Sequence, residues 1–207
     1  MSVWDERYAG EEYLFGTEPN EFLVSQGHLL KPGMSCLAVA DGEGRNGVWL
    51  AQQGLTVLSV EASAVALEKA KILARLRGVS IDFEQADLAR WPWGENRFDV
   101  VAAIFIQFAS PALRAQMFAG IKRCLKPGGL LLLQGYTPRQ LEYKTGGPPV
   151  AENMYTEALL RDAFGDMEIA HLREHDDHIG EGVAHSGISA LIDMVARKVS
   201  RAGTDKT

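Results

Sequence analysis

The sequence predicts an α/β fold, in which a doubly wound, mostly parallel sheet of about seven strands carries helices on both faces and ends in an antiparallel hairpin. Two observations lead to this prediction. Short apolar runs rich in β-branched residues alternate with longer helical patterns, which is typical of successive strand–helix–strand units. Most of these runs are apolar at consecutive positions, as expected for parallel strands that helices cover on both sides.

Five apolar runs are expected to form the parallel strands. The first, SCLAVA, precedes a glycine-rich turn, and the last, GLLLLQGY, follows the helix-ending sequence LKPGG. The predicted strands are residues 35–40, 55–60, 79–83, 98–105 and 129–136.

Two helices between these strands have clear signals. Ser110 and Pro111 are a favourable N-cap and first-turn residue for a helix that reaches Leu125. Another helix is predicted over residues 63–77, with its basic side chains exposed. Its buried face is expected to hold Val65, Leu67, Ala70, Leu73 and Leu76, and its exposed face Lys69, Lys71, Arg75 and Arg77.

The pattern changes after Tyr136. Residues 137–155 are irregular and contain GGPP, and a connection this long inside a domain is usually functional or disordered. A short helix is expected from Thr156. Residues 166–179 and 185–198 are then predicted to pair as a hairpin around IGEG. We expect one domain over residues 1–200 and a frayed tail over 201–207.

Composition excludes several classes of partner. The chain has 207 residues, 46% of them apolar, and a formal net charge of −6, so it lacks the cationic surface that nucleic acids and anionic lipids attract. The two cysteines make no disulfide framework. No secretory signal and no apolar run long enough for a membrane helix is visible, which predicts a cytoplasmic protein.

A glycine-rich loop follows the first predicted strand. Gly42 to Gly47 satisfy G-x-G-x-x-G, and Glu61 lies 19 residues after Gly42, which together resemble a dinucleotide site. However, Asp41 and Glu43 would repel a diphosphate. An NAD-dependent oxidoreductase is therefore the less favoured alternative. A ligand with a nucleoside at one end and a cationic amino-acid group at the other suits the loop better, and S-adenosylmethionine (SAM) is such a ligand.

Several motifs, in order, resemble those of class I SAM-dependent methyltransferases, which have a Rossmann-like sheet. They are ADGEGRN (40–46), VEAS (60–63), QADL (85–88), FDVVAAIF (98–105) and LKPGGLLLLQGY (125–136). The leader WDERYAGEEYLFGTEPNEFL (4–23) is similar to the segment that the small tellurite-resistance and thiopurine-type enzymes fold over the cofactor. The resemblance implies a leader of about 30 residues above the cofactor, and it fades after residue 137.

The resemblance also implies roles for individual residues. Glu61 would accept hydrogen bonds from the ribose hydroxyls, and Asp87 would bind the adenine amino group. Apart from the resemblance, the charge of Arg45 and the N–H groups after Gly44 make either one a candidate to receive the carboxylate of the cofactor. The complete set of implied cofactor-binding residues is Tyr13, Gly16, Ala40, Asp41, Gly42, Gly44, Arg45, Asn46, Glu61, Ala62, Asp87, Leu88, Ile104 and Phe105.

The first strand departs from the family pattern. In the family, the first strand usually ends in an acidic residue, and a glycine follows two positions later. In this sequence Ala38 and Ala40 occupy those two positions. We hypothesise that Asp41 supplies the missing charge. If Asp41→Asn changes cofactor affinity by no more than about twofold, this role is wrong. The two alanines also leave open a fold relative that binds the cofactor without catalysis, or binds nothing.

The methyl acceptor itself is not identified by the sequence. Tyr136 and His185 are the candidates on the substrate side, and a thiol, a metalloid oxyanion or another small metabolite would suit the fold. Trp4 and Tyr8 are as consistent with core packing as with ligand contact. The histidine-rich segment 171–185 matches no recognisable set of metal ligands, so we predict no metal site.

Overall fold

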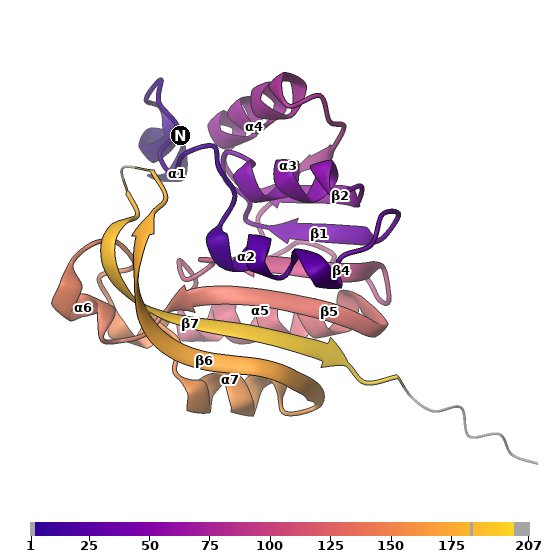
Figure 1. The fold of residues 1–207 in the computed structure, drawn as a ribbon, viewed down its shortest axis with the longest axis vertical. Helices are drawn as coiled ribbons and strands as arrows, with labels where there is room; N and C mark the ends of the chain where they lie inside the picture. Colours follow the sequence, from indigo (N-terminus) through magenta and orange to yellow (C-terminus); the bar gives the residue numbers. More distant parts are fainter. Residues whose placement is uncertain (1–2, 183, 201–207) are drawn as a thin grey trace, which may run out of the picture.

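The computed structural model describes residues 3–182 and 184–200, which form a twisted sheet between two layers of helices (Figure 1). Within this part of the chain seven strands form one sheet in the order β3-β2-β1-β4-β5-β7-β6. The strands are β1 (Ser35–Val39), β2 (Thr56–Glu61), β3 (Asp82–Gln85), β4 (Phe98–Ile104), β5 (Leu125–Tyr136), β6 (Met167–Gly180) and β7 (Ser186–Lys198). The predicted α/β fold is confirmed.

The sheet reverses its winding between β1 and β4. These two strands are parallel neighbours, while the strands that follow β1 and β4 in sequence extend the sheet in opposite directions. Strand β7 is antiparallel to both β5 and β6, which confirms the C-terminal hairpin. In sheets of this kind the crevice for a ligand lies at the carboxyl ends of the strands beside the reversal.

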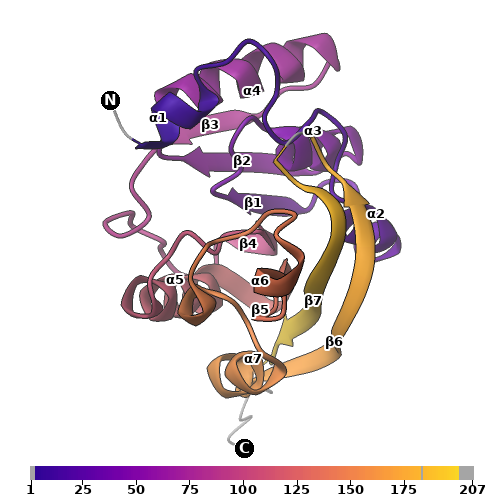
Figure 2. The same cartoon turned by 90° about the vertical axis from the view of Figure 1, so that its left-hand side faces the viewer.

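Alternate residues of the central strands pack into two separate hydrophobic cores. In β1, Leu37 and Val39 pack into one hydrophobic cluster, while Cys36 and Ala38 pack into the other. This alternation explains why the predicted strands are apolar at consecutive positions, because both faces of the sheet are covered. Figure 2 shows the two layers from the side.

Helices connect most of the successive strands, and several of them begin at residues whose side chains act as N-caps. Ser63, Ser110 and Thr156 each accept a hydrogen bond at the start of a helix. The α-helices are α1 (Val3–Tyr8), α2 (Glu21–Ser25), α3 (Arg45–Gln52), α4 (Ala64–Leu76), α5 (Pro111–Cys124), α6 (Gln140–Tyr143) and α7 (Glu157–Phe164). Short 3-10 turns cover Gly27–Leu29 and Ala151–Asn153.

The predicted third strand is displaced. Residues 79–83 were expected, but β3 spans Asp82–Gln85. The first residues of the predicted run belong to the end of α4 instead, because the Val79 N–H bonds to the Ala74 carbonyl and Gly78 adopts φ +69°, a common helix-ending arrangement. Leu76, predicted to be buried, is 75% exposed, because it falls on the outer side of the last turn of α4.

The leader and the hairpin meet at one end of the sheet. Figures 1 and 2 show β6 and β7 curving toward the N-terminal segment. The contact is made by two glycines: a Cβ on Gly182 would lie 2.4 Å from the Gly16 nitrogen, and the Ala184 N–H donates to the Leu14 carbonyl. These backbones therefore touch directly, with no side chain between them.

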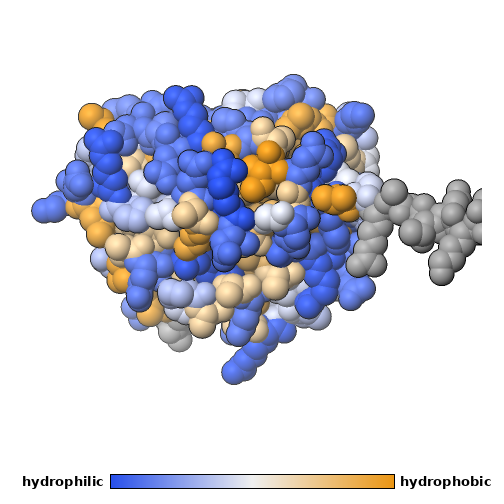
Figure 3. All heavy atoms as spheres, turned by 90° about the horizontal axis from the view of Figure 1, so that it is seen from below, coloured by the Kyte–Doolittle hydropathy of each residue, from blue (hydrophilic) through white to orange (hydrophobic). Residues whose placement is uncertain are grey.

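The face around α7 and β6 is mainly hydrophilic, and apolar side chains occur there only in small groups (Figure 3). Strand β6 forms an edge of the sheet and carries charged residues along it, a common protection against edge-to-edge pairing. In the described segments no helix combines the length and the apolar character needed to cross a membrane. The predicted tail, residues 201–207, lies outside the described residues.

Candidate active site

A cavity of about 630 Å³ opens at the carboxyl ends of the parallel strands. It divides into two chemically different parts. The acidic half contains Asp41, Glu61 and Asp87, which follow or end β1, β2 and β3. The aromatic half contains Phe15, Phe105, Tyr136 and His185, whose rings pack together, and Trp4 and Phe108 also line the cavity.

Asp41 turns back onto the start of α3. Its carboxylate oxygens accept from the Gly47 N–H at 3.1 and 3.2 Å, and one of them also accepts from the Ser59 hydroxyl at 3.1 Å. A Cβ on Gly47 would lie 2.4 Å from an Asp41 oxygen, so the last glycine of the loop leaves room for this carboxylate. Burial raises the pKa of Asp41 to about 7.

Glu43 faces away from the cavity. It is 3% exposed, pairs with Lys69 at 2.8 Å and accepts from the Leu14 N–H at 2.7 Å. The expectation that both carboxylates of the loop favour a cationic ligand is therefore wrong for Glu43, because Lys69 neutralises it. Lys69 was expected on the solvent side of its helix, yet its ammonium lies under the leader and also donates to the Glu12 carbonyl.

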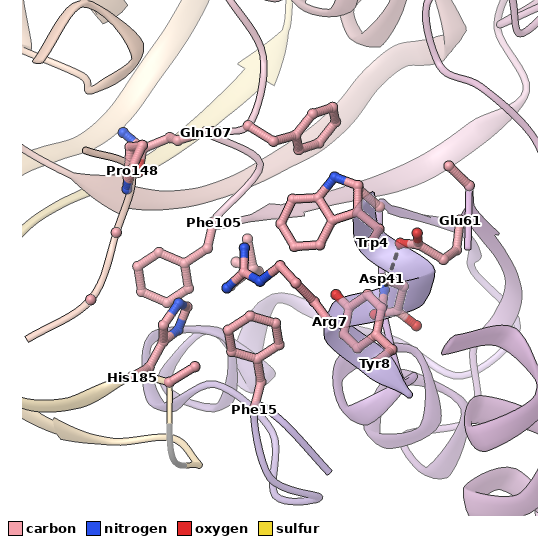
Figure 4. Close-up of a pocket in the computed structure, with 18 of the residues that line it drawn as sticks. Trp4, Arg7, Tyr8, Phe15, Asp41, Glu61, Phe105, Gln107, Pro148 and His185 are labelled. Carbon is pink, nitrogen blue, oxygen red and sulfur yellow. Dashed lines mark hydrogen bonds between the residues drawn. The ribbon is translucent and has the colours of Figure 1, made fainter. Parts of the chain in front are cut away.

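Glu61 ends β2 and is only 5% exposed. It accepts from the Gly42 N–H at 3.0 Å and from the Ser63 N–H at 2.9 Å, and burial raises its pKa. The close-up in Figure 4 shows Glu61 and Asp41 on the same side of the cavity. Asp87 is exposed and accepts from the Ala89 N–H, while Leu88 beside it is buried and lines the cavity.

Arg45 was expected to bind the carboxylate of the cofactor, but it already forms an ion pair with a carboxylate of the protein. Its guanidinium donates to Glu181 in the hairpin tip at 2.6 Å, and both side chains are buried. The other Glu181 oxygen accepts from the Asn20 amide at 2.8 Å. This amide also donates to Gln134, which in turn donates to Asp193. A buried polar chain thus joins the leader, α3, β5 and the hairpin.

Strained backbone marks the end of β4. Phe105 has φ +54°, a rare conformation for a bulky residue, and its N–H donates to the Gln134 carbonyl. Its ring centroid lies 4.7 Å from those of Tyr136 and His185. Ile104 and Phe105 both line the cavity, as the sequence implied.

Tyr136 and His185 come together as the substrate-side candidates. The Tyr136 hydroxyl and the His185 Nδ1 atom are buried and have no hydrogen-bond partner among the described residues. Burial lowers the pKa of His185 to about 3, an effect that the positive charges of Arg45 and Arg7 increase. The imidazole is consequently neutral at physiological pH.

Most of the predicted cofactor residues line this cavity, but three do not. Gly44 begins α3 and faces α4, the Tyr13 hydroxyl donates to the Lys69 carbonyl, and Gly16 backs onto Gly182. The predicted residues that line it are Ala40, Asp41, Gly42, Arg45, Asn46, Glu61, Ala62, Asp87, Leu88, Ile104 and Phe105.

Several lining residues are not evident from the sequence. The sequence is as consistent with core packing as with ligand contact for Trp4 and Tyr8, and both line the cavity. Arg7, Gln107 and the 146–149 loop were not predicted at all. The unusual GGPP sequence marked this loop as a segment of interest but gave no indication of its position.

Ala40 occupies a backbone conformation that suits glycine, with φ +47°. We expect Ala40→Gly to leave the free energy of unfolding unchanged or to raise it by up to about 1 kcal/mol, since relief of strain offsets the greater freedom of the unfolded chain. Denaturant unfolding measures this. The control is Ala119→Gly on the exposed side of α5. This variant should have a free energy of unfolding lower than that of the wild type by about 1 kcal/mol. A similar loss at both positions would contradict the strain at Ala40.

The pKa of Asp41 predicts a pH dependence of stability. Because the folded-state pKa lies above the unfolded value, the folded protein binds the extra proton, and stability falls as pH rises from about 4 to 7. Asp41→Asn removes this effect. The free energy of unfolding of the variant, minus that of the wild type, should therefore grow by about 2–4 kcal/mol over this range. A difference that stays constant with pH contradicts the shifted pKa.

Comparisons with known proteins agree with this geometry. Residues 36–129 match the family model described as a methyltransferase domain. An uncharacterised methyltransferase of Synechocystis is 34% identical over 123 residues, which are 57% of this chain and 54% of that protein, so the chain spans about half the length of this curated relative.

Two solved structures show the same fold. One is a SAM-dependent methyltransferase of Methanosarcina mazei, with TM-score 0.71, 18% identity, and coverage of 88% of this chain and 99% of that one. The other is a protein described in the conversion of a disulfide bond into a thioacetal group during echinomycin biosynthesis. It has TM-score 0.78, 19% identity, and coverage of 97% and 91%. Residues 36–129 therefore resemble a methyltransferase domain, and the chain has a Rossmann-like methyltransferase fold.

Proposed function

We propose that the chain transfers a methyl group from SAM to a small-molecule acceptor. One observation carries the proposal: the carboxylates of Asp41, Glu61 and Asp87 gather at one end of the cavity, and none has an ion-pair partner among the described residues. Such a site favours a ligand with a cationic amino-acid group and ribose hydroxyls, and it disfavours a diphosphate.

The residues of the acidic half fit SAM. Glu61 would hold the ribose hydroxyls, Asp87 and the Leu88 N–H the adenine, and Asp41 the ammonium group. When bound, SAM supplies a methyl group already activated by its sulfonium, so the chain needs no nucleophile of its own. The protein's task is to align the acceptor and to exclude water.

The aromatic half is the proposed acceptor site. Tyr136 and His185 lie there with unpartnered polar atoms, and the two glycines at 146–147 pack against Tyr136. We propose an acceptor with a thiol, a metalloid oxyanion or another small nucleophile, as in the tellurite-resistance and thiopurine-type group. Nucleic acid is disfavoured by the net charge of −6.

Calorimetry with SAM, S-adenosylhomocysteine (SAH) and NADH tests the cofactor. Binding of the first two and not the third supports the proposal, and production of SAH in the presence of an acceptor panel then establishes transfer. Tight binding of NADH alone would indicate the oxidoreductase. Binding of none of the three would indicate a fold relative without this cofactor.

A further inference from the structure

We infer that the aromatic half of the cavity selects a planar, negatively charged acceptor, and that Arg7 is the counter-ion of this charge. The inference rests on the proposed function, because it names the class of acceptor for the same cavity.

Arg7 is the cation of the cavity lining that has no ion-pair partner within the described part of the chain. Its guanidinium carbon lies 4.6 Å from the centre of the Trp4 ring, and among the described residues no carboxylate pairs with it. Figure 4 shows the side chain pointing into the cavity toward Phe105 and His185. The other lining cation, Arg45, is neutralised by Glu181 at 2.6 Å. An anion that enters the aromatic half therefore finds its counter-charge at Arg7.

The walls of this half favour a flat ligand. His185 stands between two phenylalanine rings, with centroid distances of 4.5 Å to Phe15 and 4.7 Å to Phe105. Phe105 in turn lies 4.7 Å from Tyr136. Rings at these separations pack against one another, and the faces and edges that they leave toward the cavity form an aromatic wall against which a planar group can stack. In Figure 4 the Arg7 guanidinium points away from Glu61 and Asp41 and toward Phe105 and His185.

Two buried polar atoms of this half, the Tyr136 hydroxyl and His185 Nδ1, have no hydrogen-bond partner among the described residues. Burial raises the pKa of Tyr136, so its hydroxyl remains a donor, and no described residue accepts from it. The Gln107 amide is held by the protein, because it donates to the Tyr136 carbonyl at 2.8 Å and accepts from the Tyr136 N–H at 2.6 Å. Gln107 instead fixes the end of β5.

Among the described residues of this half, none is an effective general base. Neutral His185, with a pKa near 3, takes up a proton poorly, and Tyr136 stays protonated. An acceptor that arrives as an anion has no proton to lose. Its lone pair forms the new bond to the methyl carbon, the carbon–sulfur bond breaks, and its electrons remain on sulfur, which leaves as the neutral thioether of SAH.

The test uses four probes on the full chain saturated with SAH: benzoate and phenylacetate as planar anions, and their neutral amides, benzamide and phenylacetamide. Calorimetry or ligand-observed NMR should show each anion binding at least tenfold more tightly than its amide. Arg7→Gln should reduce this discrimination to less than threefold and leave SAH affinity within twofold. Arg75→Gln, on the exposed side of α4, is the matched control and should change neither quantity.

Each other result overturns the inference in a recognisable way. Equal binding of anions and amides, or no binding of any probe, excludes a planar anionic acceptor. Loss of SAH affinity in Arg7→Gln, with anion binding retained, assigns Arg7 to the carboxylate of the cofactor. Failure of the wild type to bind SAH at all refutes the proposed function itself, and the inference with it.

Discussion

Glu61→Gln is expected to weaken SAH binding by about 10- to 100-fold. The carboxylate ends β2 beside the cavity, and two backbone N–H groups hold it in place. An amide loses the negative charge and presents an NH₂ group where an acceptor is needed, either to the ribose or to the Gly42 and Ser63 N–H groups. Hydrogen bonds to a charged group contribute about 1.5–3 kcal/mol, which corresponds to this loss of affinity.

The matched control is Glu43→Gln, since Glu43 is a buried carboxylate of the neighbouring loop that faces Lys69. This variant should lose stability but bind SAH within about threefold of the wild type. Calorimetric titration of SAH into both variants at the same pH compares the two affinities. Equal effects of the two substitutions would mean that Glu61 supports the loop and does not contact the cofactor.

Gly44→Ala is expected to lower the free energy of unfolding by about 2–4 kcal/mol. Gly44 begins α3 with φ +88°, a conformation that alanine adopts only with strain. A Cβ at this position would also lie 2.6 Å from the Ala70 Cβ, so α3 and α4 would have to separate. Denaturant unfolding with an unchanged m-value measures the loss.

Gly78→Ala separates these two causes. Gly78 has a similar φ of +69°, but a Cβ there meets nothing within 4 Å. Its cost is the conformational strain alone, about 1 kcal/mol. If the two variants lose the same stability, the contact between α3 and α4 does not require glycine.

The fold was predictable because its signals are local and repeated. Strands covered on both faces are continuous apolar runs, and helix caps such as Ser110 are short motifs, so both are visible in the sequence. The failure at the third strand has a physical cause as well. Val79 is apolar because it packs beneath the end of α4, and a β-branched residue in that role has the same appearance as the start of a strand.

The site was predictable where topology alone determines it. Acids that follow consecutive parallel strands must meet at one edge of the sheet, which brings Glu61 and Asp87 into the same cavity. The direction of each side chain was not predictable. Glu43 turns toward Lys69, 26 residues away in the sequence, and Arg45 pairs with Glu181, 136 residues away. No local pattern encodes such partners.

The leader is predicted to cover the cofactor, but the sequence does not indicate which of its aromatic rings face the cavity. Tyr13 was preferred over Tyr8, yet Tyr8 lines the cavity and Tyr13 bonds to α4. Which tyrosine lines the cavity depends on how α1 packs against α4, and this is a tertiary contact.

The division of the cavity has a consequence for protein engineering. Residues 36–129 supply the acidic half, whereas Trp4, Arg7, Phe15, Tyr136 and His185 lie outside that segment. Grafting new termini onto this central segment should therefore change the lining of the aromatic half while leaving the three carboxylates of the acidic half in place. Both termini must come from the same donor protein, because Asn20 bonds to Glu181 and Gly16 touches Gly182. A chimera whose two termini come from different donors would bury either the residue at the position of Asn20 or the one at the position of Glu181 without its hydrogen-bond partner.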